Sequence, residues 1–127
     1  MSPQWIDLNV VLAVHEQQIA EHGGLAGIRD LGLIESALAR PQNLQLHNDP
    51  DLFDLAAAYG FGLARNHGFV DGNKRTAYVV TRLFLVLNGQ DVEASAVEKV
   101  LTFEKVGNGE IDQAGLSSWL RIHSIGL

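Results

Sequence analysis

The segment from Ala77 to Leu87 is the most apolar stretch of the chain, and Arg82 is its only charged residue. It follows directly on the polar segment His67–Thr76 and is followed by Gly89, a residue typical of a helix end. These limits predict a helix from about Asn73 to Asn88. Because the helix is apolar nearly all round, neighbouring elements have to enclose it, and we expect it to be the central helix of the domain.

Capping residues and apolar periodicity predict further helices along the chain. They cover Leu8–Glu21 after the cap Asp7, a short helix after the cap Asp30 that is stopped by Pro41, Pro50–Asn66 after the cap Asp49, Ala94–Val106, and Gln113–Ile122 after the cap Asp112. The connections between them are read as an ordered turn at 23–29, an irregular segment at 42–48 and a turn at 107–109. Strand signals are weak throughout. The expected fold is therefore an all-α domain of about six helices, with residues 1–127 forming a single domain.

Composition excludes several classes of protein. The net charge of −6 and the pI near 5.2 argue against direct binding of nucleic acid, which needs a basic face. The chain has no cysteine, which is compatible with a reducing cytoplasm and excludes disulfides. No signal peptide is visible, and the longest apolar run is well short of the ~20 residues that a membrane span requires. We expect a soluble, cytoplasmic protein without a membrane partner.

The loop before the central helix carries the polar chemistry of the chain. A helix start has open backbone N–H groups and a partial positive charge, so it attracts phosphate. Asn73, Lys74 and Arg75 would surround this start with further donors. Asp71 offers a carboxylate to a divalent cation, and His67 belongs to the residue type that exchanges protons near neutral pH. The loop is thus predicted to hold a base, a metal ligand and a phosphate site.

Each of these residues also has a purely structural interpretation. Asp71 could serve only as a helix cap, and Lys74 with Arg75 could be a solvated pair, although two cations at a helix start are unfavourable unless an anion offsets them. The remaining histidines are interpreted as capping or surface residues, namely His15, His22, His47 and His123. No Gly-x-x-x-x-Gly-Lys-[Ser/Thr] sequence occurs, so a P-loop enzyme is not expected.

The pattern His-x-Phe-x-Asp-Gly-Asn-Lys-Arg at residues 67–75 resembles the signature of Fic-fold proteins, and specifically of the death-on-curing (Doc) branch. The segments 23–30 and 33–41 are similar to the amino-terminal half of that branch, so the resemblance covers nearly the whole chain. It implies that His67 is the catalytic base, that Phe69 packs the loop and that Asp71 binds the metal. It also assigns the binding of nucleotide phosphates to the start of the helix, at Gly72, Asn73, Lys74 and Arg75.

The resemblance further implies a reaction, cofactors and partners. A Doc-type protein kinase transfers the γ-phosphoryl group of ATP, with Mg²⁺, to a protein hydroxyl, a threonine of translation elongation factor Tu, and so inhibits translation. A Phd-like antitoxin would block the site with its carboxy-terminal segment. The AMP-transferring Fic class has glycine in place of Lys74 and a second arginine in place of Tyr78, whereas the Doc branch more often has alanine in place of Gly72. Two alternatives stay open: AMP transfer to a protein hydroxyl, and a non-catalytic interaction protein of the Fic fold.

Overall fold

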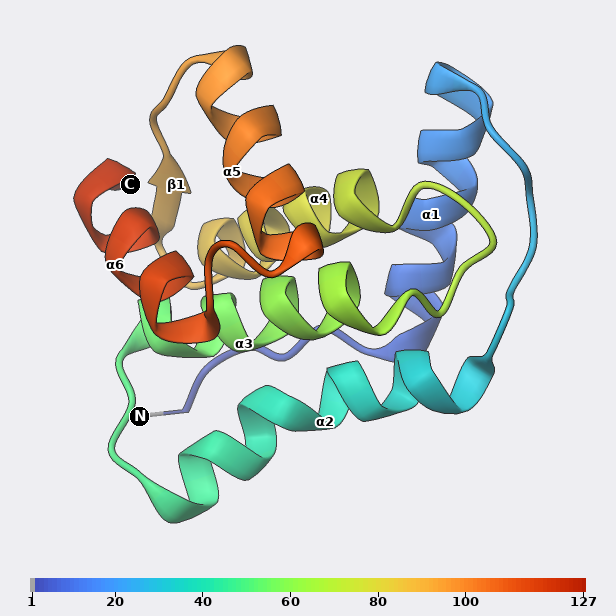
Figure 1. The fold of residues 1–127 in the computed structure, drawn as a ribbon. Coiled ribbons are helices and arrows are strands. Elements are labelled where there is room, and N and C mark those ends of the chain that lie inside the picture. The colour runs from blue at the N-terminus through green and yellow to red at the C-terminus, as the bar shows by residue number, and fades with distance from the viewer. Residues whose placement is uncertain (1) are drawn as a thin grey trace.

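Six helices make up most of residues 2–127, the part of the chain that the computed structural model describes (Figure 1). They are α1 (Leu8–His22), α2 (Leu31–His47), α3 (Leu52–Asn66), α4 (Asn73–Leu87), α5 (Ala96–Asn108) and α6 (Gln113–His123). The prediction of a domain of about six helices is confirmed. In the same residues, no helix is long and apolar enough to cross a membrane.

A short antiparallel sheet adds to the helices. Strand β1 (Gln90–Val92) pairs with β2 (Ser124–Gly126), with Asp91 opposite Ile125. The sheet ties the end of the chain to the segment that leaves α4. Strands this short give too few alternating residues for a sequence signal, so the sequence analysis did not identify them.

The centre of the fold is α3, which is buried from Leu55 to Ala64 except at Phe61. It packs against α2, α4, α5 and α6, and its small residues let these neighbours approach closely. The apolar helix α4 also belongs to the core, through residues such as Val80 and Phe84. However, α3 is more completely enclosed than α4, because one face of α4 lines a cleft and Leu87 near its end is 43% exposed.

At α2 and α3, two predicted helix limits are wrong. Helix α2 continues through Pro41 to His47, so residues 42–47 are helical and not an irregular connection. A proline inside a helix costs about 3 kcal/mol, but Pro41 is buried and the helix packs along α3, so tertiary packing outweighs the local penalty. Helix α3 begins after Asp51, whose carboxylate accepts a hydrogen bond from the N–H of Asp54, and not after the predicted cap Asp49.

Candidate functional site

The loop between α3 and α4 is shaped by an unusual residue at its start. His67 ends α3 in the left-handed region (φ 51°, ψ 48°), and it is the only non-glycine residue of the described chain with a positive φ. Such a conformation is uncommon for residues with a side chain and turns the chain sharply out of the helix. The His67 side chain remains exposed, as a proton acceptor for an incoming substrate requires.

The segment between α1 and α2 holds this loop from one side, and both run past each other beside α1 (Figure 1). The N–H groups of Arg29 and Asp30 donate to the carbonyl of Gly68 at 2.8 and 2.9 Å, and the N–H of Val70 donates to the carbonyl of Gly27 at 3.1 Å. The Arg29 side chain adds a 2.7 Å bond from Nε to the carbonyl of His67. The segment predicted as an ordered turn is therefore the brace of the loop.

Asn73 and Phe69 fix the loop from inside. The Asn73 side chain accepts from the N–H of Phe69 and donates to its carbonyl, both at 3.0 Å. Phe69 is 2% exposed and packs into the core, as expected for the anchor of the loop. Because both ends of the Asn73 amide are engaged in these bonds, Asn73 shapes the loop in this structure; its contact with phosphate stays a prediction.

His15 on α1 is a supporting residue that the sequence analysis missed. It is 5% exposed, its ring stacks on that of Phe69 at 3.7 Å between centroids, and its Nε2 lies 2.8 Å from the carbonyl oxygen of Asp71. The interpretation of His15 as a capping or surface residue is wrong. His15 follows Val11 by four residues and Val14 by one, and both valines are buried on the same helix. This spacing could have indicated from the sequence that His15 faces inward.

The carboxylate of Asp71 is held in its charged form. The N–H of Leu25 donates to Oδ2 at 3.1 Å and the N–H of Gly72 donates to Oδ1 at 2.8 Å. These two bonds lower the pKa of Asp71, helped by the nearby Arg75 and His15 and opposed by a desolvation effect. An ionised carboxylate whose oxygens each accept one backbone bond keeps lone pairs for a hard cation.

The start of α4 is open to an anion. Gly72 precedes the helix in the left-handed conformation (φ 74°) and offers no side-chain cap, so the N–H groups of Asn73, Lys74 and Arg75 have no acceptor within residues 2–127. The other helices of that range all begin with a capping Asp or Ser side chain. Only α4 therefore presents its partial positive charge uncovered.

A cleft of about 810 Å³ brings together every site residue predicted from the sequence. His67, Asp71 and the start of α4 from Gly72 to Arg75 all line it, between walls contributed by α1 and α5. Arg75 also donates to the carbonyl of Gly23 at 2.9 Å, so it links the cleft to the bracing segment. In Figure 1, α1 and α5 rise on either side of the beginning of α4.

Helix α5 adds a cation that the sequence analysis did not identify. Lys99 lines the cleft, and its Nζ lies 5.5 Å from the centroid of the Tyr78 ring, which stands one turn after Lys74 on α4. No local pattern marks Lys99, because its nearness to the loop depends on how α5 packs against α4. The cleft thus has three cations, Lys74, Arg75 and Lys99, in a chain with a net negative charge.

Comparison with known proteins identifies the family. The model of the Fic/DOC family matches residues 5–85, well over half of the chain. The chain belongs to the Fic/DOC family. The matched Fic/DOC region contains α1 to most of α4, and with them the loop and the bracing segment.

Two curated Fic/DOC relatives extend the comparison. The protein named "Protein kinase doc" of Escherichia phage P1 is 37% identical over 112 residues, which cover 87% of this chain and 88% of the relative. The protein named "Toxin Doc" of Mycolicibacterium smegmatis is 49% identical over 74 residues. That alignment covers 57% of each chain, so this chain matches little more than half the length of the mycobacterial relative.

Proposed function

We propose that this chain is a Doc-type toxin that acts as a protein kinase, transferring the γ-phosphoryl group of ATP to a hydroxyl of a target protein. The observation that carries the proposal is the cleft in which the exposed His67, the ionised Asp71 and the uncapped start of α4 meet. The cleft can bind a phosphate group and a cation at the same time, and His67 provides a proton acceptor beside them. The name of the phage relative supports kinase activity, and the name of the mycobacterial one supports a toxin.

The proposed chemistry uses positioning and charge neutralisation. The backbone N–H groups at the start of α4, with Lys74 and Arg75, bind the phosphate chain of ATP. His67 accepts the proton of the incoming hydroxyl as its oxygen forms a bond to the γ-phosphorus. The bond between that phosphorus and the bridging oxygen breaks, and ADP leaves with the electron pair. The products are ADP, the phosphorylated protein and a proton that passes from His67 to solvent.

The residues present fit a magnesium ion. Within residues 2–127 no cluster of three His, Cys, Asp or Glu side chains could enclose a metal, so Asp71 would be a single protein ligand. That arrangement suits Mg²⁺, which proteins commonly hold by one or two carboxylates together with substrate phosphates and water. When bound, the ion would neutralise negative charge on the phosphates, while Asp71 keeps it beside the start of α4.

Two side chains favour phosphoryl transfer over AMP transfer. In the AMP-transferring pattern, glycine at the place of Lys74 leaves an open anion pocket, and a second arginine stands at the place of Tyr78. Here Lys74 brings a cationic side chain to the cleft, and Tyr78 lines the cleft with no guanidinium to hold terminal phosphates. A nucleotide presenting its γ-phosphoryl group to the nucleophile fits these residues better.

The proposed target is a threonine of elongation factor Tu, and the proposed regulator is a Phd-like antitoxin. The test is incubation of the purified chain with elongation factor Tu, Mg²⁺ and either γ-labelled or α-labelled ATP, followed by intact-mass measurement. Label from γ-labelled ATP and the added mass of one phosphoryl group are expected. An added AMP group would instead establish AMP transfer, and no label in elongation factor Tu or in a cell lysate would favour a non-catalytic role.

A further inference from the structure

Helix α5 contains a glycine that its own backbone does not require. Gly107 was expected to lie in a turn, but α5 continues through it to Asn108, and the left-handed residue that ends the helix is Gly109 (φ 90°). Gly107 itself has no positive φ. Glycine is less favourable than alanine inside a helix, so we looked for a contact outside the helix that a side chain at position 107 would disturb.

The side chain of Lys74 occupies the space that a side chain at position 107 would need. A Cβ built on Gly107 would lie 2.8 Å from Cε, 3.2 Å from Cγ and 3.3 Å from Cδ of Lys74, and these are its three nearest atoms. The shortest of these distances is closer than carbon atoms approach without a bond, and even Cγ, near the base of the lysine, is crowded. A side chain at position 107 would therefore displace the end of Lys74 and push its Cγ and Cδ aside by a few tenths of an ångström.

No polar contact in the described chain fixes the direction of Lys74. Its ammonium group makes no ion pair or hydrogen bond within residues 2–127, and the side chain is exposed. The methylene groups of Lys74 instead pack against α5 at Gly107, and a contact of this kind can orient a lysine side chain. Lys74 belongs to α4 and Gly107 to α5, so this contact also couples the phosphate-binding end of one helix to the last turn of the other.

We propose that Gly107 is a positioning residue for Lys74: the absence of a side chain there lets Lys74 lie along α5 and present its ammonium group to the phosphates of the nucleotide. The nucleotide part of this inference rests on the proposed kinase function. Gly107 touches no reacting atom and acts only through Lys74.

The first experiment reads the position of Lys74 without any nucleotide. The chain has three lysines, at positions 74, 99 and 105, so reductive methylation with ¹³C-formaldehyde gives few NMR signals. Gly107→Ala is expected to shift the Lys74 signal strongly and the Lys105 signal little. The matched control is Gly32→Ala, the same change in α2, where the nearest atom to the new Cβ is Oδ1 of Asp30 and no lysine is near. An unchanged Lys74 signal in Gly107→Ala overturns the proposal.

The second experiment separates action through Lys74 from a general effect on the fold. Gly107→Ala should weaken ATP binding roughly tenfold, as expected when a charge-assisted contact is misplaced. In a Lys74→Ala background the same change should have no further effect, because the group it displaces is already absent. Equal weakening in both backgrounds, or none in the wild-type background, overturns the proposal.

Thermal unfolding completes the test. Alanine suits a helix better than glycine, and the three atoms nearest to the new Cβ belong to a flexible lysine. Gly107→Ala should therefore have a melting temperature no lower than that of the wild type. A clearly lowered melting temperature would mean that the new Cβ meets rigid structure, which contradicts the inference. If the wild-type chain binds no ATP, the proposed function fails, and the NMR measurement alone still decides whether Gly107 positions Lys74.

Discussion

At the scale of single residues, the site divides into side chains that face the cleft and side chains that hold the loop. His67 and Lys74 are exposed at the cleft, whereas His15 and Phe69 are buried beneath it. Asn73 belongs with the second group in this structure, because its amide is bonded to the backbone of Phe69. Substitutions in the first group should change chemistry, and those in the second should change the shape of the loop.

Replacing His67 tests the proposed base. His67→Ala is expected to reduce phosphoryl transfer by about 10² to 10⁴-fold, the usual effect of removing a general base. Unfolding temperature and ATP affinity should change little, because an exposed loop side chain contributes little packing. His47→Ala, at an exposed position at the end of α2, is the control and should transfer at the wild-type rate. Full transfer by His67→Ala would refute the assignment.

The charge of Asp71 gives a prediction about pH. Hydrogen bonds from Leu25 and Gly72 lower the pKa of Asp71 below its usual 3.8. The Asp71 carboxylate therefore binds a proton less readily in the folded protein than in the unfolded chain. Its contribution to stability is therefore complete above about pH 4 and is lost as the pH falls through the lower, folded-state value. A ¹³C NMR titration of the Asp71 carboxyl group should give a midpoint below 3.8. A midpoint above that value would contradict the hydrogen bonding described here.

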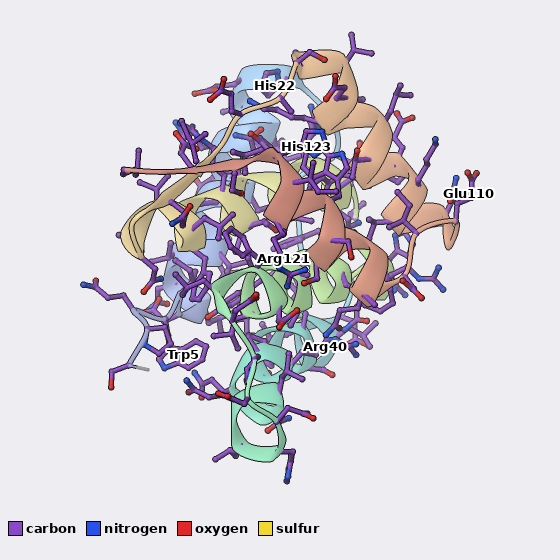
Figure 2. All side chains as sticks on the ribbon, turned by 90° about the vertical axis from the view of Figure 1, so that its left-hand side faces the viewer. Trp5, His22, Arg40, Glu110, Arg121 and His123 are labelled. Atoms are coloured by element: carbon purple, nitrogen blue, oxygen red, sulfur yellow. The ribbon has the colours of Figure 1, made fainter. Side chains whose placement is uncertain are left out.

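At the scale of elements, a polar cluster joins the beginning of α3 to the second half of α6. Asp51 and Asp54 form a capping box at the start of α3, and Arg121 of α6 reaches both carboxylates, at 2.9 and 3.2 Å. Figure 2 shows Arg121 between the two helices. Burial would raise the pKa of Asp54, but hydrogen bonds from Ser117 and from the Asp51 backbone, together with Arg121, outweigh it and lower that pKa.

The two aspartates before α3 provide a matched pair of variants. Asp51→Ala is expected to destabilise the protein by about 1 kcal/mol, because a helix loses its cap. The ion pair with Arg121 adds little, since both side chains are about half exposed. Asp49→Ala, at the position that the sequence favoured as the cap, should leave the free energy of unfolding nearly unchanged. Urea unfolding of both variants checks this, and a larger loss at Asp49 would contradict the observed helix start.

At the scale of the whole molecule, one apolar core links residues from Ile6 before α1 to Leu120 in α6. Phe84 of α4 lies at its centre and is fully buried, with the rings of Trp5 at 6.0 Å and Tyr59 at 5.1 Å between centroids. It thereby connects the amino-terminal segment, α3 and α4. The helix with the uncapped start is thus anchored in the core through Phe84.

Truncation of Phe84 should destabilise the whole domain. Phe84→Ala is expected to cost about 3 to 5 kcal/mol, a large part of the roughly 5 to 15 kcal/mol that stabilises a typical domain. Leu87, three residues further on, is 43% exposed, so Leu87→Ala should cost much less. Denaturant unfolding measures the free energy of unfolding of both variants, with the same dependence on denaturant concentration applied to each. Equal losses of unfolding free energy in the two variants would contradict the difference in burial between Phe84 and Leu87.

Local sequence determined most of the helix starts and the grouping of polar residues in the loop before α4. Helix starts at Asp7, Asp30 and Asp112 follow from the short-range bond between a side chain and an N–H group three residues on. The grouping of His67, Asp71 and Lys74 could be predicted because these residues are close together in the sequence, between the end of α3 and the start of α4. Their proximity depends on the covalent backbone and needs no distant contact.

Tertiary structure decided the rest, because those features depend on segments far apart in sequence. Pro41 stays helical only because α2 packs on α3, and His15 becomes part of the site only because α1 lies against Phe69. The place of Lys99 on the cleft and the space left by Gly107 for Lys74 depend on the packing of α5 against α4. Local patterns report the preferences of a residue and its near neighbours, whereas these contacts form only when whole helices are brought together.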